Sequence, residues 1–181
     1  MRIISGKLKG RKIDGFDLDG TRPTMERVKE SLFAMIQNQL DDALVLDLFA
    51  GSGNLGIEAI SQGAKKSILV DHNNKAIKII KKNIENLDLS QSVDIICSDY
   101  LKALDILKDK KFDIIFLDPP YKTNFIEKSI EKITNNNILN ESGIIVCESS
   151  MLDKIIYPNT YTAIKEKKYG DKYVVILKKV W

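Results

Sequence analysis

The sequence predicts an α/β fold in which a mostly parallel sheet of seven strands lies between helices. Short, continuous apolar runs alternate along the chain with longer segments whose apolar residues recur at helical spacing. Such runs are typical of strands that are buried on both faces of a parallel sheet. The last two apolar runs have no helical segment between them. We therefore expect them to form a hairpin at the edge of the sheet, with one edge strand antiparallel.

The individual elements can be placed in chain order. Residues 2–13 hold short apolar groups around Ser5-Gly6 and Lys9-Gly10, which favours a small β-hairpin or an extended arm. Apolar residues at helical spacing then predict an amphipathic helix over 24–39. The strands expected after it cover 44–49, 67–70, 93–97, 112–117, 143–147, 161–165 and 174–177, and the helices cover 55–62, 73–87, 100–107 and 125–133. We therefore expect an N-terminal extension over 1–40 and a main domain over 41–181.

The composition excludes several classes of protein. Hydrophobic residues make up 44% of the chain, but no apolar run is long enough to span a bilayer or to resemble a signal peptide. We expect a soluble, cytoplasmic monomer. Cys97 and Cys147 lie in apolar runs, so we expect buried free thiols. With a single histidine, His72, and no close cysteine spacing, the sequence predicts no metal site.

The charge distribution is more informative than the formal net charge of +3. The chain before Asp14 carries no acidic residue and five basic ones, which are Arg2, Lys7, Lys9, Arg11 and Lys12. Six lysines recur near the C-terminus, at positions 165, 167, 168, 172, 178 and 179. Such clusters can contact phosphates of nucleic acid. The alternative is the solvated face of a lysine-rich protein.

A glycine loop joins the first expected strand of the sheet to the next helix, with the spacing Gly51-x-Gly53-x-x-Gly56. Glycines let a backbone turn sharply and approach a ligand closely. The spacing also matches a dinucleotide fingerprint, with Asp71 at the distance expected for binding ribose hydroxyls. Asp47, inside the strand, suits the cationic ammonium of S-adenosylmethionine better than the pyrophosphate of NAD. The expected cofactor site consists of Asp47, Phe49, Ala50, Gly51, Ser52, Gly53, Asp71, His72, Asp99 and Tyr100.

Three of these residues are aspartates at successive strand ends. We expect Asp71 to bind the ribose, and Asp99 to accept from the adenine amino group with Tyr100 against the ring. The alternative role is capping of the helices that follow. An NAD-linked oxidoreductase also stays open at this point, although it needs a separate catalytic residue that the sequence does not offer.

The tetrad Asp118-Pro119-Pro120-Tyr121 follows the fourth expected strand. The two prolines fix φ and remove two N–H donors, which leaves carbonyl oxygens on a rigid turn. Asp118 and a carbonyl of Pro119 or Pro120 can accept the N–H bonds of a nucleobase amine and direct its lone pair at a methyl donor. Tyr121 can stack on the base. The four residues therefore predict methylation of an exocyclic base amine, and the alternative is a turn with a purely structural role.

The sequence resembles the RsmD-type 16S ribosomal RNA guanine-N2 methyltransferases over nearly its whole length. The matching motifs are Arg2-Ile3-Ile4-Ser5-Gly6 with Gly10, Thr21-Arg22-Pro23-Thr24 with Arg27 and Glu30, Asp47 to Gly53, Asp118 to Tyr121, and Lys168-Tyr169-Gly170-Asp171. The resemblance implies a class I methyltransferase fold and a guanine substrate in the assembling small ribosomal subunit. It implies that Thr21 to Thr24 lie against the active site. The residues expected to contact RNA are Arg2, Lys7, Lys9, Arg11, Arg22, Thr24 and Arg27.

The tetrad alone does not select guanine, because DNA adenine-N6, other RNA and protein-glutamine methyltransferases share it. The N-terminal motifs make that choice. Asn54 and Tyr121 are mild departures from the family pattern. A DNA adenine or tRNA methyltransferase is the alternative within the same chemistry, although no target-recognition domain is evident. A non-catalytic assembly factor is less compatible with an intact tetrad and glycine loop.

Overall fold

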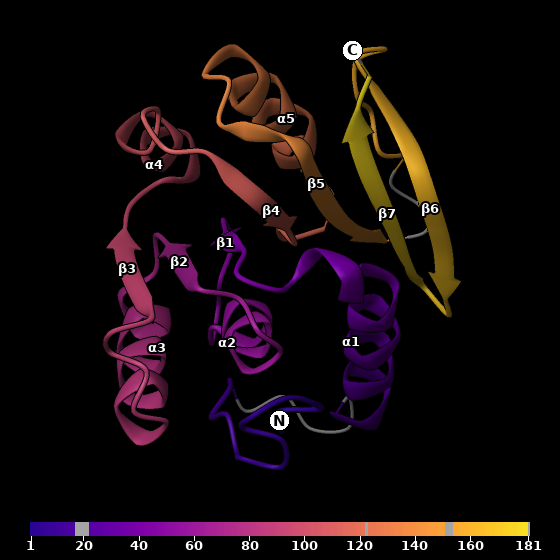
Figure 1. Ribbon diagram of the computed structural model, residues 1–181. Coiled ribbons are helices and arrows are strands. Elements are labelled where there is room, and N and C mark those ends of the chain that lie inside the picture. Colours follow the sequence, from indigo (N-terminus) through magenta and orange to yellow (C-terminus); the bar gives the residue numbers. More distant parts are fainter. Residues whose placement is uncertain (17–21, 122, 151–153, 181) are drawn as a thin grey trace.

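The computed structural model describes residues 1–16, 22–121, 123–150 and 154–180, which form a three-layer α/β fold (Figure 1). The sheet has seven strands in the order β3-β2-β1-β4-β5-β7-β6. The strands are β1 (Leu44–Asp47), β2 (Lys66–Asp71), β3 (Val93–Cys97), β4 (Phe112–Leu117), β5 (Leu139–Ser150), β6 (Tyr161–Tyr169) and β7 (Lys172–Lys179). The helices are α1 (Arg22–Ile36), α2 (Asn54–Ser61), α3 (Asn74–Asn86), α4 (Tyr100–Ile106) and α5 (Phe125–Asn135), with a 3-10 turn, Gln37–Gln39, after α1.

The expected mostly parallel sheet is confirmed. Strand β1 pairs in parallel with β2 on one side and β4 on the other, so the chain order reverses between β1 and β4. Ligands of such sheets bind outside the carboxyl ends of the strands at this reversal. The edge hairpin is also present, and its antiparallel strand, β7, lies one place inside the edge strand β6. This order is explained by burial, because the middle of β7 is buried whereas most of β6 is exposed.

Helices cover both faces of the sheet. Helices α1, α2 and α3 lie on one face, and α4 and α5 lie on the other (Figure 1). Because side chains alternate along a strand, each inner strand contributes to both cores. The first core includes Val45, Phe116, Val146 and Val174. The second core includes Leu46, Ile115, Ile145 and Val175.

The alternation continues past the apolar residues of the first core. The next position on the same side of β1, β4, β5 and β7 is polar in each case. These positions are Asp47, Asp118, Glu148 and Lys172. Four ionisable side chains from four neighbouring strands therefore gather on the α1 and α2 side of the sheet, at the carboxyl ends of β1, β4 and β5.

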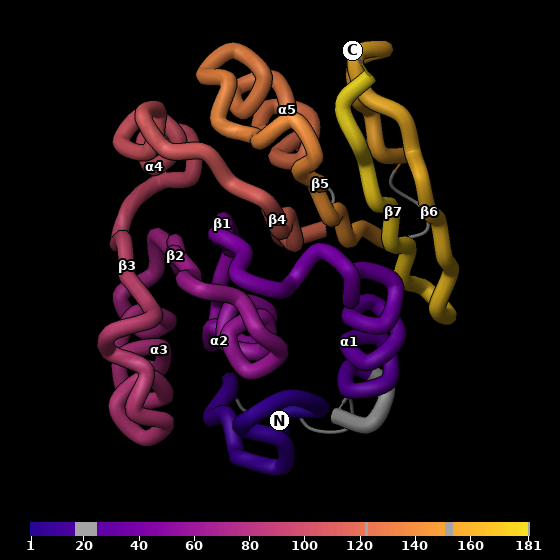
Figure 2. Tube along the Cα trace, in the orientation of Figure 1, coloured from indigo at the N-terminus to yellow at the C-terminus, as the bar shows by residue number. Residues whose placement is uncertain are grey.

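The N-terminal arm, residues 1–16, packs beneath α2 and α1 (Figure 2). Arg2 and Lys12 form an isolated antiparallel bridge, which confirms the small hairpin in a minimal form. Lys7 N–H donates to the carbonyl of Ser61 in α2 at 2.8 Å. Gly6 has φ +85°, and a Cβ at this position would lie 1.8 Å from the Ser61 oxygen, so only glycine fits there.

Two buried polar groups fasten the arm. Lys29 of α1 and Glu58 of α2 form a fully buried ion pair with an N–O distance of 2.8 Å. Glu58 accepts the backbone N–H groups of Ile4 and Ser5, and Lys29 donates to the carbonyl of Arg2. Burial lowers the pKa of Lys29, against the opposing effect of Glu58. The arm and the main domain therefore share one core and one polar network.

Several expectations are corrected by the structure. Cys147 is buried as expected, but Cys97 is exposed, because it stands at the end of the edge strand β3. Strands β5, β6 and β7 each extend beyond the apolar residues that predicted them, since backbone pairing also continues through polar positions. Within the described part of the chain, no helix has the length and apolar character needed to cross a membrane.

Candidate active site

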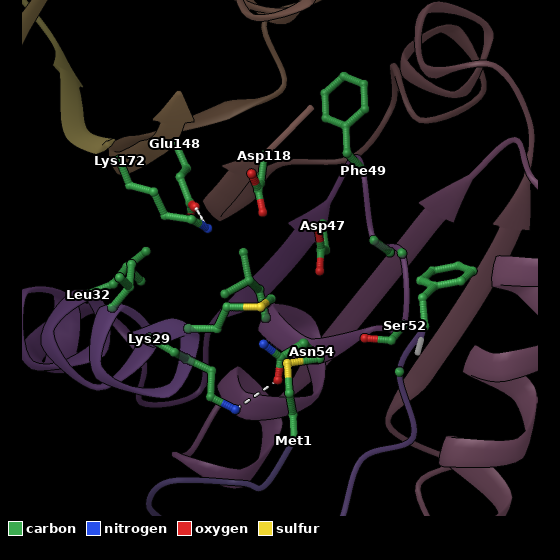
Figure 3. Close-up of a pocket in the computed structure, with 17 residues that line it drawn as sticks. Met1, Lys29, Leu32, Asp47, Phe49, Ser52, Asn54, Asp118, Glu148 and Lys172 are labelled. Carbon is green, nitrogen blue, oxygen red and sulfur yellow. Dashed lines mark hydrogen bonds and ion pairs between the residues drawn. The ribbon is translucent and has the colours of Figure 1, made fainter. Parts of the chain in front are cut away.

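A cavity of about 260 Å³ lies between α1, the glycine loop and the carboxyl ends of β1, β4 and β5 (Figure 3). Its sheet side is polar and consists of Asp47, Asp118, Glu148 and Lys172. Its α1 side is mainly apolar and includes Met25, Val28 and Leu32. Met1 and Phe16, from the two ends of the arm, also line it. The cavity therefore joins the glycine loop and the tetrad aspartate, as the sequence predicts, with three charged residues that were not expected in the site, namely Lys29, Glu148 and Lys172.

The glycine loop has the backbone geometry that its sequence requires. Gly51 and Gly53 have φ values of +57° and +85°, a region that side chains disfavour. Gly51 N–H donates to Asp71 Oδ2 at 2.9 Å, and Gly56 N–H donates to Asp47 Oδ2 at 3.1 Å. A Cβ at Gly56 would lie 2.1 Å from Leu69 Cδ2, so this glycine allows α2 to pack closely on β2. The loop thus borders the cavity with a backbone held by two aspartates.

Asp47 is a buried carboxyl group with one unsatisfied oxygen. Its exposure is 1%, and its Oδ1 has no hydrogen-bond partner among the described residues. Burial raises the pKa of Asp47 to about 7, and the nearby charge of Asp71 adds to this, while the Gly56 N–H opposes it. An uncompensated carboxylate beside a cavity is a strong acceptor for a cationic group. Asp47 can therefore hold an ammonium.

A second, smaller cavity of about 140 Å³ lies beside the first, along the ends of β2 and β3. It is lined by Leu48, Phe49, Asp71, His72, Ser98, Asp99, Tyr100, Pro120 and Phe125. Five of these nine residues were predicted to bind the cofactor. Phe49 lines both cavities and also packs on Tyr100, with ring centroids 5.2 Å apart. The cofactor residues thus divide between two adjoining cavities, with Phe49 at their junction.

The strand-end aspartates also have structural roles. Asp99 Oδ1 accepts the N–H groups of Leu101 and Lys102 and caps α4, so the capping interpretation holds for this residue. Asp71 Oδ1 accepts from Asn73 N–H at 2.8 Å. His72 is exposed beside Asp71, with its Nδ1 3.8 Å from the carboxylate. Capping fixes one oxygen of Asp99 and leaves the other for a ligand.

The tetrad follows β4, and its residues line both adjoining cavities: Asp118 lines the larger one and Pro120 lines the smaller one. Asp118 lies in the cavity with Glu148, Lys172 and Asp47. Burial and the charge of Glu148 hold the pKa of Asp118 well above its usual range, although Lys172 opposes this shift. The carbonyl of Pro120 accepts from Thr123 Oγ1 at 2.9 Å, which leaves the Pro119 carbonyl as the better candidate acceptor. Tyr121 is 44% exposed, as a stacking surface requires.

Three charged residues of the site were not predicted from the sequence: Lys29, which pairs with Glu58, and the pair of Glu148 and Lys172. Lys172 Nζ contacts Glu148 Oε1 at 2.5 Å, and the two side chains are 20% and 7% exposed. Burial opposes the charged form of Lys172, but Glu148 and Asp118 together raise its pKa. From the sequence, Lys172 is one of six lysines near the C-terminus that were expected to form a basic cluster. The signal available for both residues of the Glu148–Lys172 pair was alternation with a period of two. Glu148 lies two positions after Val146, and Lys172 lies two positions before Val174.

The residues expected to contact RNA lie along the arm and α1. Arg2, Lys7, Lys9 and Arg11 of the arm are exposed, and so is Arg27 of α1. Arg11 donates to the carbonyl of Asn86 at 2.7 Å. Arg22 and Thr24 belong to α1, but their side chains and all of Thr21 lie outside the described residues.

One buried amide joins the arm to the glycine loop. Asn83 of α3 is 1% exposed. Its Nδ2 donates to the carbonyls of Asp14 and Ser52 at 2.8 and 3.0 Å, and its Oδ1 accepts from Asp14 N–H at 2.9 Å. The end of the arm and the wall of the cavity are therefore held by the same side chain.

Comparisons with known proteins agree with this architecture. A family model described as Conserved hypothetical protein 95 matches residues 1–178. The Ribosomal RNA small subunit methyltransferase D of Buchnera aphidicola is 39% identical, over 91% of this chain and 86% of that protein. The Putative rRNA methyltransferase YlbH of Bacillus subtilis is 39% identical over 99% of both. The solved structure of the putative methyltransferase yhhF from Escherichia coli has a TM-score of 0.88 at 30% identity, covering 99% and 97% of the two chains.

Proposed function

Because the chain belongs to the Conserved hypothetical protein 95 family, that of the RsmD-type ribosomal RNA methyltransferases, we propose that it methylates the exocyclic N2 amine of a guanine in 16S ribosomal RNA. The resemblance and the class I methyltransferase fold predicted from the sequence are both confirmed, and the chain is a methyltransferase. The methyl donor is S-adenosylmethionine. The proposal extends to a monomer that acts in the cytoplasm on the assembling small subunit.

The observation that carries the proposal is the meeting of Asp118 with Asp47 and the glycine loop in one cavity. A methyl acceptor and a methyl donor must be held in line, and such positioning can contribute roughly 7–11 kcal/mol of the barrier. The tetrad provides acceptors for an amine, and the loop provides a site for the donor. Neither motif alone brings both reactants together.

The residues present fit S-adenosylmethionine. The unsatisfied Oδ1 of Asp47 suits the methionine ammonium. Asp71 and Asp99 line the adjoining cavity, where they suit the ribose hydroxyls and the adenine amino group. The aromatic rings of Phe49 and Tyr100 line it as well. When bound, the cofactor supplies a methyl group on a sulfonium centre, whose carbon–sulfur electron pair stays with sulfur as the new nitrogen–carbon bond forms.

The chain itself prepares the amine. Asp118 and the Pro119 carbonyl each accept one N–H of the target amine, which draws its nitrogen out of conjugation and directs the lone pair toward the methyl carbon. The methylated nitrogen then carries one proton too many, and that proton passes to Asp118 or to water. The raised pKa of Asp118, caused by burial and by Glu148, suits it to receive this proton. Tyr121 stacks on the base, which is worth roughly 1–3 kcal/mol.

Residues 1–40 form the RNA-docking extension in this proposal. The exposed basic residues of the arm and Arg27 contact phosphates, and the arm's two ends reach the cavity at Met1 and Phe16. Basic contacts of this kind provide affinity and orientation, whereas the base itself is recognised in the cavity. The catalytic domain covers 41–181.

The target is tested by mass mapping of 16S ribosomal RNA from cells with and without the gene. We expect one guanine to lose a methyl group in the deletion strain, and purified protein with S-adenosylmethionine to restore it on small-subunit particles. A modified adenine, or a change confined to tRNA or DNA, would support the alternative substrates instead. Ribosomal RNA with an unchanged pattern would contradict the proposal.

The chemistry is tested by Asp118→Ala. The variant should lose methyl transfer at least about 100-fold, because the amine loses its principal acceptor, while calorimetric binding of S-adenosylmethionine persists. Asp109→Ala, an exposed change in the turn before β4, is the matched control and should be fully active. Retained transfer in Asp118→Ala would remove this carboxylate from the mechanism.

A further inference from the structure

The Glu148–Lys172 pair lies in the catalytic cavity, but in the chemistry described above Glu148 acts only through the pKa of Asp118, and Lys172 has no role. Glu148 also lines a third cavity, of about 260 Å³, on the outer side of Pro119, Pro120 and Tyr121. The carboxylate therefore stands at the boundary between the cofactor side and the outer side of the tetrad. Tyr121 and Glu148 both line this outer cavity, so a base stacked on Tyr121 with its amine at Asp118 has its edge beside Glu148.

The strand register places Glu148 beside Asp118. Phe116 of β4 is opposite Val146 of β5, so Asp118 and Glu148, two residues further on, are neighbours on adjacent strands. Adjacent strands are about 4.8 Å apart. In Figure 3 the two carboxylates lie side by side, with the Lys172 ammonium against Glu148. Two acceptors at this spacing suit two hydrogen-bond donors on neighbouring atoms of one base.

The Watson–Crick edges of guanine and adenine differ at the ring nitrogen N1, which lies next to the reacting amine. Guanine carries its N2 amine next to N1–H, so it presents donors on two neighbouring atoms. Adenine carries its N6 amine next to an unprotonated N1, which is an acceptor. A carboxylate accepts only, so a second carboxylate beside Asp118 attracts guanine and repels adenine.

We propose that Glu148, held by Lys172, selects guanine by accepting its N1–H while Asp118 and Pro119 accept from its N2 amine. Lys172 binds Oε1 of Glu148, and among the described residues no hydrogen bond is made to Oε2. Lys172 also offsets the repulsion between two neighbouring carboxylates in a partly buried site. Glu148 is thus a specificity residue and Lys172 is a positioning residue. This inference rests on the proposed guanine-N2 activity.

The test uses RNA in which the mapped target guanine is replaced by 2,6-diaminopurine. This base keeps the reacting N2 amine but has an acceptor at N1. Synthetic RNA is ligated into 16S ribosomal RNA, reconstituted into particles and incubated with the protein and S-adenosylmethionine. Chromatography with mass spectrometry separates the N2-methyl product from any N6-methyl product. Wild-type protein should favour guanine in kcat/KM by about 100-fold or more, as sites that bind a substrate N–H through a buried partner do.

Glu148→Gln should relax this preference. The amide can donate to the N1 acceptor of 2,6-diaminopurine, so activity on that RNA rises while activity on guanine RNA falls, and the ratio moves to within about tenfold. Glu131→Gln, an exposed change on α5, is the matched control and should keep the wild-type ratio. Melting temperature and cofactor affinity establish that each variant is folded.

Two further variants separate selection from structure. Glu148→Asp keeps a carboxylate with a shorter reach, so kcat/KM on guanine RNA should fall at least about tenfold while the preference for guanine persists. Lys172→Met should raise KM for guanine RNA, whereas Lys110→Met, at the opposite end of β4, should not. A ratio unchanged in Glu148→Gln, or a fully active Glu148→Asp, would overturn the inference. Wild-type protein that methylates no guanine would instead overturn the proposed function.

Discussion

Folding and cofactor binding place opposing requirements on the charge of the Asp47 side chain. Burial raises the pKa of its carboxyl group to about 7, far above the value near 3.8 expected in an unfolded chain. Between about pH 4 and pH 7 the folded protein therefore keeps a proton on Asp47 that the unfolded chain has lost. The contribution of this group to folding falls as the pH rises through that window, because the charged form is costly to bury. The same charged form is the one that can bind a cofactor ammonium.

We expect Asp47→Asn to stabilise the cofactor-free protein at pH 8 and to weaken the binding of S-adenosylmethionine. A neutral amide removes the burial cost of the charge, which is worth on the order of a few kcal/mol, or 2–4 °C in Tm per kcal/mol for a chain of this size. Differential scanning calorimetry at pH 5 and pH 8 measures the first effect, and isothermal titration measures the second. The gain should shrink at pH 5, where wild-type Asp47 is already neutral. A variant with a lower Tm at pH 8 and full cofactor affinity would contradict both expectations.

Residue roles could be predicted from the sequence where a local motif marked them. Asp118 and Gly51 stand in short patterns whose spacing carries the chemistry, and the structure brings both to one cavity. Glu148 and Lys172 stand in no such pattern. Their partnership depends on β7 pairing with β5, a contact between segments far apart in the chain. Period-two spacing gives the face of each residue but not its neighbour.

At the scale of elements, the docking of the arm on α2 needs a close approach of the two backbones at Gly6, in addition to the side-chain contacts of Lys29 and Glu58. Gly6 and Gly10 have nearly equal φ values, +85° and +83°. A Cβ at Gly6 would meet the Ser61 carbonyl, whereas a Cβ at Gly10 would meet nothing within 4 Å. Substituting either glycine therefore causes a similar backbone strain, but only a side chain at Gly6 would collide with Ser61.

Gly6→Ala should displace the arm from α2, and Gly10→Ala should not. Both changes carry the cost of a left-handed φ, roughly 1–2 kcal/mol, so the difference between them isolates the contact with Ser61. We expect Gly6→Ala to weaken RNA binding several-fold more than Gly10→Ala. Hydrogen exchange at Lys7, whose N–H donates to Ser61, reports the displacement directly. Equal exchange in the two variants would show that the arm docks by other contacts.

The elements themselves could be predicted because their patterns are strong. Continuous apolar runs located the sheet strands, and the missing helix before the last strand located the hairpin. The ends of β5 and β6 were harder to predict from apolar residues. Ser149 and Ser150 of β5 and the lysines of β6 are paired by their backbones, and most of β6 faces solvent. Exposed strand segments leave no apolar signal.

At the scale of the whole molecule, a net charge of +3 is modest for a protein that is proposed to bind RNA. The proposed affinity must then come from the local arrangement of basic residues on the arm. Lys7 and Lys9 are exposed there and pair with no acidic side chain among the described residues. Asp14, by contrast, is paired with Lys12 and Lys82, which keep its pKa low.

We expect Lys7→Gln/Lys9→Gln to reduce the salt dependence of RNA binding. Each phosphate contact releases counterions and contributes about 0.7–0.9 to the slope of log K against log[salt]. The double variant should therefore lower the slope by about 1.5, while cofactor affinity stays the same. Filter binding at 50–300 mM KCl measures it, with Lys110→Gln as the control. A slope equal to that of wild-type protein would place the arm away from the phosphates.

Asn83 has a consequence that reaches across the molecule. Because this one amide holds both the end of the arm and the carbonyl of Ser52, any shift of the glycine loop on cofactor binding would also displace the end of the arm. Thermodynamic reciprocity then applies: whatever factor the cofactor imposes on RNA affinity, RNA imposes on cofactor affinity. With such a displacement, each ligand would act as an effector of the other.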